Sequence, residues 1–230
     1  MVTAPRRTWV HAAFELAGIL ALWALVALIC ARIVIHTDGA GQWSWLALSL
    51  IAGYFFSDFM SGLMHWAGDT IGDENMPILG RAFIGPFREH HADPTAITRH
   101  GFLETNGNNS LITLPMLLGV LLGFPEPEAP GLFVLGLSGS TAVFTFGTNQ
   151  FHKWAHADEV SPFIGRLQAW GLILPPRRHA LHHAPPHDQH YCITTGMCSG
   201  LLGRMRFFRG LEWMIARVSP DALRREGRAG

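Results

Sequence analysis

Four long apolar stretches constrain the fold of this chain more than any other feature. They cover about residues 14–35, 43–64, 110–124 and 131–151. A helix that crosses a bilayer needs roughly 20 residues, and only helices or closed barrels satisfy their backbone there. The third stretch is short and contains Pro115, so we expect it to be tilted, kinked or partly inserted. The pattern predicts an all-α integral membrane protein with about four transmembrane helices.

The composition agrees with a membrane domain. Charged residues make up 15% of the chain, hydrophobic residues 49%, and the formal net charge is zero. This balance excludes the basic field by which many proteins attract nucleic acid. Cys30, Cys192 and Cys198 are too scattered for a disulfide framework. Arg6 and Arg7 precede the first apolar run, which is too long for a cleaved signal, so we expect a retained anchor.

The distribution of Lys and Arg predicts the orientation. Segments 36–42 and 125–130 contain none, whereas residues 65–109 contain three and residues 153–230 contain eleven. Positive loops stay on the cytoplasmic side, so we expect both termini there, in a bacterial inner membrane, with Arg32 as an exception. Segments 65–109 and 152–199 then emerge on one face, as a cytoplasmic cap.

The part of the chain after residue 153 is not predicted to span the membrane. We expect a short surface helix over about 163–174, ended by Pro175 and Pro176. Residues 200–218 mix apolar side chains with arginines, which is typical of an interfacial amphipathic helix, although packing on the rest of the domain explains the pattern equally well. We expect residues 1–219 to form one domain and residues 220–230 a polar, disordered tail.

Histidines recur at helical spacing in the predicted cap. His65 and Asp69 lie four residues apart after the second apolar stretch, as do His152 and His156 after the fourth. If both helices continue for one turn, each pair shares a face. Two further clusters complete the pattern, namely His90 with His91, followed by His100, and His179 with His182 and His183.

These clusters together predict a metal centre. Imidazole is a natural ligand for iron, zinc and copper. A zinc site needs three or four protein ligands, whereas eight to ten histidines suit two metal ions that keep an open position for O₂, which indicates iron. Soluble di-iron bundles use Glu and Glu-x-x-His instead. A histidine-rich metal-sensing loop is the alternative, but such loops are usually low-complexity tracts.

The same segments resemble a known family. Residues Pro86 to His100, Glu104 to Asn109, Asn149 to His156, and His179 to Gly196 are similar to the lipid desaturase family. That family contains plasmanylethanolamine desaturase, a bacterial homologue needed for light-induced carotenoid synthesis, and a plant plastid enzyme that acts on phosphatidylglycerol. The likeness runs from about Phe55 to Cys198. It implies two iron ions and an O₂-dependent desaturation that turns the alkyl ether of a plasmanyl lipid into the vinyl ether of a plasmalogen.

The resemblance also implies a ligand set. The family's essential histidines fall on His65, His90, His91, His100, His152, His156, His179, His182 and His183, with Asp69 and His187 as further candidates. One departure from the wider membrane desaturases is that Phe87 stands at the first position of the His-x-x-His-His box. One imidazole must then come from elsewhere, and His100 is our choice. We do not count His190 as a ligand.

Other polar residues in these segments are candidates for supporting roles. Glu89, Asp93 and Asn108 are candidates to orient imidazoles, because a metal-bound histidine usually donates its other N–H. Asp93-Pro94 and Asn106-Gly107 are equally well explained as turns. Asn109 is a weaker ligand candidate. Four arginines are candidates for the phosphate of a lipid headgroup, or simply topology charges: Arg88, Arg99, Arg177 and Arg178.

Desaturation would require partners. The substrate would be a membrane lipid, an ether phospholipid, entering from the bilayer. Two electrons per cycle must come from outside, because the chain has no flavin or haem motif. We therefore expect a cytochrome b5-like or ferredoxin-like donor. Two alternative functions remain open, an acyl-chain desaturase or hydroxylase that acts on a glycerolipid, and a non-catalytic metal-binding membrane protein.

Overall fold

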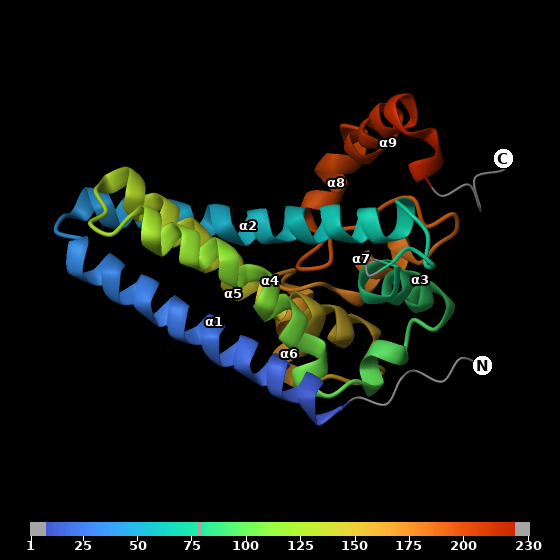
Figure 1. Ribbon diagram of the computed structural model, residues 1–230, viewed down its shortest axis with the longest axis horizontal. Coiled ribbons are helices and arrows are strands. Elements are labelled where there is room, and N and C mark those ends of the chain that lie inside the picture. The colour runs from blue at the N-terminus through green and yellow to red at the C-terminus, as the bar shows by residue number, and fades with distance from the viewer. Residues whose placement is uncertain (1–7, 78–79, 224–230) are drawn as a thin grey trace. The chain divides into compact units, whose positions relative to one another are not determined.

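The computed structural model describes residues 8–77 and 80–223, so that Arg6, Arg7 and the end of the predicted tail lie outside the described residues. Within them the chain forms nine α-helices and no strand (Figure 1). The helices are α1 (Trp9–His36), α2 (Ala40–Thr70), α3 (Gly85–Ala92), α4 (Phe102–Gly123), α5 (Ala129–His156), α6 (Pro162–Ala169), α7 (Pro176–His182), α8 (Met197–Arg204) and α9 (Phe207–Val218). A π-helix precedes α3, and 3₁₀-helices cover Ala96–Arg99 and Pro220–Ala222. The all-helical prediction is confirmed.

Three helices are long and apolar enough to cross a membrane, namely α1, α2 and α5. Each contains one of the predicted apolar stretches and extends beyond it. The remaining stretch forms the second half of α4, whose first half carries Glu104, Asn106 and Asn108 and is therefore more polar. The structure thus confirms four long helices at the predicted places, and three of them meet the criteria for a span.

The chain forms two compact units. Of the described residues, one unit contains those up to Ser57 together with His100–Gln150, and the other contains those within Asp58–Arg99 and those from Phe151 onward. Helices α2 and α5 contribute residues to both.

The first unit is built from α1, α4 and the N-terminal parts of α2 and α5. Its core is a set of buried aliphatic side chains that includes Leu22, Ile29, Leu117 and Leu135. Large apolar side chains also cover the outer face of α1, where Trp9 is 81% exposed. A helix that is apolar on both its buried and its exposed faces fits a lipid environment.

Small residues allow the helices of this unit to approach closely. A Cβ atom at Gly53 of α2 would lie 2.5 Å from the carbonyl oxygen of Leu137 in α5, so only glycine fits there.

Arg32, which departs from the charge bias of the loops, has a structural role. Its guanidinium donates to the carbonyl oxygens of Leu121 and Phe124 and so caps the C-terminus of α4.

The second unit is tied together by a buried carboxylate. Asp58, on α2, accepts hydrogen bonds from the backbone N–H groups of Thr195, Gly196 and Cys198, at 2.7–2.9 Å. Gly196 has φ +72°, a conformation that glycine adopts without strain, and α8 begins immediately after it. Asp58 therefore anchors the segment that connects α7 to α8.

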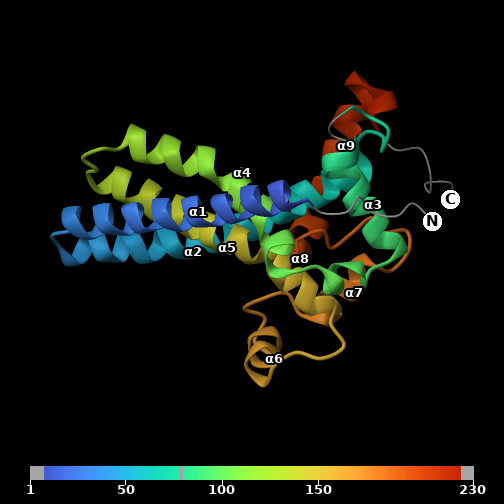
Figure 2. The same ribbon diagram turned by 60° about the horizontal axis from the view of Figure 1, so that its bottom comes forward.

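The C-terminal region differs from the single predicted amphipathic helix over 200–218. It forms two helices, α8 and α9, which lie against each other (Figure 1). The break falls at Arg206, whose φ of +53° cannot continue a right-handed helix. The predicted surface helix near 163–174 is the shorter α6, on the connection between α5 and α7 (Figure 2). Residues 220–222 of the predicted tail form the 3₁₀-helix.

Candidate metal centre

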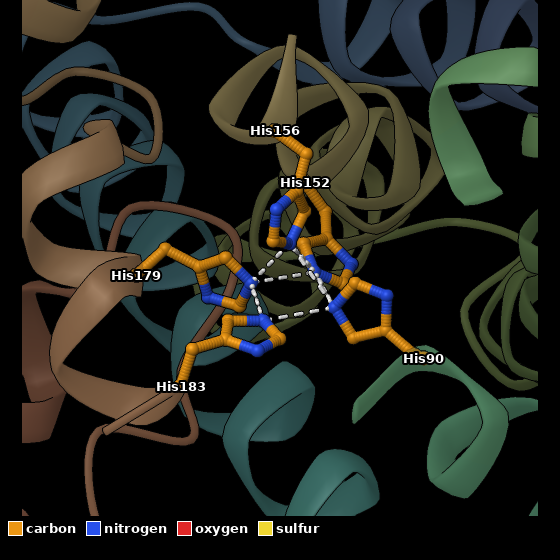
Figure 3. Close-up of side chains that lie close together, drawn as sticks. All are labelled: His90, His152, His156, His179 and His183. Carbon is orange, nitrogen blue, oxygen red and sulfur yellow. Dashed lines mark hydrogen bonds between the residues drawn. The ribbon is translucent and has the colours of Figure 1, made fainter. Parts of the chain in front are cut away.

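Five histidines of the second unit point their rings toward a common centre (Figure 3). His90 comes from α3, His152 and His156 from the last turn of α5, and His179 and His183 from α7 and its C-terminal cap. The two pairs from α5 and α7 are each spaced by four residues, which places both members on one face of the helix. We call these residues the five-histidine group.

The Nε2 atoms of this group are too close to be satisfied by hydrogen bonds alone. Seven pairs of them lie 2.7–3.2 Å apart. His90, His152 and His156 contact one another in all three pairings. An imidazole nitrogen either donates or accepts, so three mutually contacting nitrogens cannot all be paired donor to acceptor. A cation that faces all the lone pairs removes this conflict.

The spacing also fits the coordination distances of a metal ion. With a metal–nitrogen distance of about 2.1 Å, ligands at right angles are about 3.0 Å apart, and tetrahedral ligands about 3.4 Å. The observed separations of 2.7–3.2 Å match the first arrangement. All five ligand atoms lie within 4.8 Å of one another, which leaves room for opposite ligands at about 4.2 Å. The residues therefore fit one metal ion.

A second group lies beside the first and includes a carboxylate. It contains His65 and Asp69 from α2, His91 from α3 and His182 from α7, and we call it the mixed group. The Asp69 carboxylate is 3.1 Å from His91 Nε2 and 3.5 Å from Nε2 of both His65 and His182. Among the described residues, neither ring nitrogen of His65 has a hydrogen-bond partner, although the side chain is fully buried. A metal ion would satisfy such a buried nitrogen.

Burial keeps four of these imidazoles, those of His90, His179, His182 and His183, uncharged. Desolvation, aided by the neighbouring histidines, lowers the pKa of His90 to about 2, that of His182 to about 3 and that of His183 to about 4. Burial also holds the pKa of His179 well below its usual value. At neutral pH these four rings therefore keep a nitrogen lone pair, and this neutral form is the one that binds metal.

Backbone carbonyls fix the orientation of two rings. His182 Nδ1 lies 2.9 Å from the carbonyl oxygen of Gln189, and this oxygen can only accept. The proton therefore sits on Nδ1, and the Nε2 lone pair of His182 faces the mixed group. His187 is bound in the same way through the carbonyl of His182, at 3.2 Å, and its ring contacts that of His91. His187 thus lines the mixed group without belonging to it.

The remaining predicted ligand and supporting residues are not brought into either group. His100 is half exposed, and its Nε2 is 3.8 Å from Glu104. Asp93 forms an ion pair with Arg99 at 2.6 Å. Glu89 and Asn108 are exposed. The Asn109 amide donates to the carbonyl of Thr145 in the first unit.

Three of the four arginines proposed for a lipid phosphate have other partners. Arg88 donates to the carbonyl of Gly72 at 2.7 Å, two residues beyond the end of α2. Arg178 donates to the carbonyl of Thr195 at 2.9 Å. Arg99 is paired with Asp93, and Arg177 is exposed.

Sequence reasoning missed two residues that support the site. Gln189 acts through its carbonyl oxygen, which no side-chain pattern reveals. Tyr191 is buried beside His65 and His182, with ring centroids 6.2 and 5.3 Å apart. Burial raises the pKa of the Tyr191 phenol, so it stays protonated. The sequence offered one signal for Tyr191, namely that an aromatic residue follows shortly after the histidine cluster His179 to His183.

Comparison with known proteins identifies the family. Residues 54–225 match the lipid desaturase domain. The chain is 43% identical over 203 residues to plasmanylethanolamine desaturase of Myxococcus xanthus, covering 88% of this chain and 71% of the relative. It is 44% identical over 183 residues to plasmanylethanolamine desaturase 1 of Mus musculus, covering 76% of this chain and 66% of that relative.

A plant relative is more distant. Fatty acid desaturase 4, chloroplastic, of Arabidopsis thaliana is 32% identical over 210 residues, covering 90% of this chain and 62% of the relative. No solved structure matches the chain. The match to the domain and the identity to the two closer relatives agree with the sequence motifs and with the geometry of the two donor groups. The chain belongs to the lipid desaturase family, whose members are oxidoreductases that act on lipids.

Proposed function

We propose that this protein is a di-iron desaturase that converts the 1-O-alkyl ether of plasmanylethanolamine to the vinyl ether of a plasmalogen. The observation that carries the proposal is the convergence of nine donor atoms into two adjacent groups. The relatives named plasmanylethanolamine desaturase, at 43% and 44% identity, supply the substrate class.

The proposed ligands are the members of the two groups, and iron is the proposed metal. The near-right-angle spacing of the five-histidine group favours iron over a tetrahedral zinc site. When bound, two iron ions and O₂ would supply the oxidant that unactivated methylene groups require. Two hydrogen atoms leave adjacent carbons of the substrate, and together with two electrons and two protons from a donor they reduce O₂ to two waters.

The protein's own residues would bind, orient and keep the site dry. His182 is held in one tautomer by Gln189, and Asp69 supplies a negative charge close to three imidazoles. His65 and His182 are fully buried, which limits the access of water to their side of the mixed group. A dry site strengthens electrostatic interactions and protects reactive species from side reactions.

The membrane arrangement is part of the proposal. We propose that α4 is a fourth span and that both termini and the histidines face the cytoplasm of a bacterium. The Lys and Arg bias of the loops supports this orientation. We further propose that residues 1–219 act as one domain and that a cytochrome b5-like or ferredoxin-like protein delivers the electrons.

Lipid analysis tests the function. The protein would be expressed with an electron donor in a host that lacks plasmalogens and is supplied with alkyl-ether phospholipid. We expect acid-labile vinyl ethers, released as aldehydes, to appear only with the protein. An acyl-desaturated product without vinyl ether would contradict the proposal. It would favour the second candidate, an acyl-chain desaturase, which the 32% identity to fatty acid desaturase 4 supports.

A further inference from the structure

A cavity of about 500 Å³ in the second unit has no part in the metal centre. It lies between residues 188–190 and the junction of α8 and α9. Its lining combines three arginines, Arg204, Arg206 and Arg209, with the carboxylate of Asp188. None of these residues was a sequence-based candidate for the site.

The charges of this cavity are only partly compensated. Arg209 forms an ion pair with Asp188, with the nitrogen and oxygen 3.0 Å apart. Arg204 and Arg206 are exposed, and among the described residues neither guanidinium has an ion pair or a hydrogen bond to the protein. Guanidinium groups bind phosphate oxygens through paired, charge-assisted hydrogen bonds. Two such groups beside a salt bridge have the charge and the donors that phosphate requires.

The backbone of the cavity adopts unusual conformations. Arg206 has φ +53° and His190, also in the lining, has φ +58°. Residues other than glycine rarely adopt a positive φ, and those that do are enriched at functional sites. The turn at Arg206 ends α8 and starts α9 in a new direction, so it shapes the wall that carries Arg204 and Arg209.

The cavity is connected to the metal centre through two contacts. Gln189 lines the cavity, and its carbonyl oxygen accepts the hydrogen bond from His182 of the mixed group. Tyr191 packs against His182 on one side and against Phe208 on the other, with ring centroids 5.3 and 4.9 Å apart. Phe208 also lines the cavity. A ligand in the cavity would therefore be held one side chain away from the mixed group.

The surface around the cavity suits lipid. Leu201 of α8 and Met205 at the C-cap of α8 are 63% and 65% exposed. Trp213 and Met214 of α9 are 57% and 51% exposed. Exposed apolar side chains next to arginines are typical of a surface that rests at the lipid–water interface.

We propose that this cavity binds the phosphoethanolamine headgroup of the substrate lipid, an inference that rests on the proposed function. Arg204 and Arg206 would bind the phosphate, and Asp188 would bind the ammonium group. A zwitterion suits this site because its phosphate would face Arg204 and Arg206 while its ammonium group faces Asp188, so that the net charge of the site is unchanged. The site lies apart from the arginines that the sequence had suggested.

A direct binding experiment tests the phosphate contact without turnover. The iron-loaded full chain in detergent would be titrated calorimetrically with 1-O-alkyl-2-lyso-glycerophosphoethanolamine. We expect Arg204→Gln combined with Arg206→Asn to raise the dissociation constant about 10-fold or more, with iron content unchanged. Asn is chosen because it tolerates the left-handed conformation at position 206.

A matched control variant distinguishes binding in the cavity from a general attraction of the probe to positive surface charge. Arg166→Gln combined with Arg217→Gln removes the same charge from α6 and α9 outside the cavity lining. We expect this control to bind the probe as the unaltered protein does. An equal rise of the dissociation constant in both double variants would overturn the proposal, because the effect would then come from the positive charge of the surface as a whole. Unchanged binding in the cavity variant would overturn it as well.

Two further titrations, with inorganic phosphate and with a phosphocholine analogue, identify the ligand. Inorganic phosphate should bind about 10-fold more weakly than the lipid probe, and equal affinity would mean a site for free phosphate instead. The phosphocholine analogue should bind more weakly than the phosphoethanolamine probe, and Asp188→Asn should abolish that difference. If binding follows these expectations but the protein forms no vinyl ether, the proposed function fails while the headgroup site stands.

Discussion

The two donor groups of this protein share two helices but differ in chemistry. Helices α3 and α7 contribute to both groups, while α5 supplies only the five-histidine group and α2 only the mixed group. The first offers nitrogen alone, and the second adds the carboxylate of Asp69. Since a buried negative charge stabilises a nearby cation strongly, the two groups should hold their metal ions with different affinities and redox properties. The centre is therefore asymmetric in its ligands.

The largest effect should follow removal of a ligand from the middle of the five-histidine group. His152 contacts His90, His156 and His179 through its Nε2 atom. We expect His152→Ala to lower the iron content from about two ions per chain to about one and to reduce vinyl-ether product about 100-fold or more. Metal analysis and lipid analysis measure the two quantities.

The control for this prediction is a histidine outside both groups. His36 hydrogen-bonds to the carbonyl of Arg32 in the first unit, and His36→Ala should leave iron content unchanged. If His152→Ala kept both its iron and its activity, the five-histidine group would not be a metal site. Helix content by circular dichroism would establish that the variant is folded.

A smaller and more selective effect is expected from removing the charge of the mixed group. Asp69→Asn keeps the shape of the side chain but not its charge. We expect the affinity for one of the two iron ions to fall about 10–100-fold and activity to recover partly with excess iron. Iron titration of the metal-free protein measures this affinity, with Glu104→Gln as a control for an exposed carboxylate beside a histidine. Equal loss of both ions would contradict the separation into two groups.

The smallest effect is expected at His100, which the family resemblance favoured as a ligand. Its side chain is 44% exposed and lies near Glu104, and it belongs to neither group. We expect His100→Ala to keep iron content and product within about twofold of the unaltered protein, as is usual for exposed positions. Loss of one iron ion would identify His100 as a ligand and would contradict the membership of the mixed group described above.

Neighbouring histidines show where sequence reasoning stops. The spacing of His152 and His156 predicted a pair on one helical face, and the structure brings their Nε2 atoms to 3.2 Å. The adjacent His90 and His91 are divided between the two groups, because neighbours on a helix point about 100° apart. The helix α7 also divides its cluster, with His182 in the mixed group and its two neighbours in the other.

The sequence by itself determined the all-helical class, the positions of the four long helices, the clustering of histidines and the family. Local patterns suffice for the helices and the histidine clusters, since apolar length and helical spacing depend only on nearby residues, whereas the family was indicated by the resemblance of the motifs. Only the tertiary structure decided how the donors divide into two groups, that His100 lies outside them and that Gln189 orients His182. These features depend on how α2, α3, α5 and α7 face one another, and such long-range packing leaves no signature in the spacing of residues along one helix.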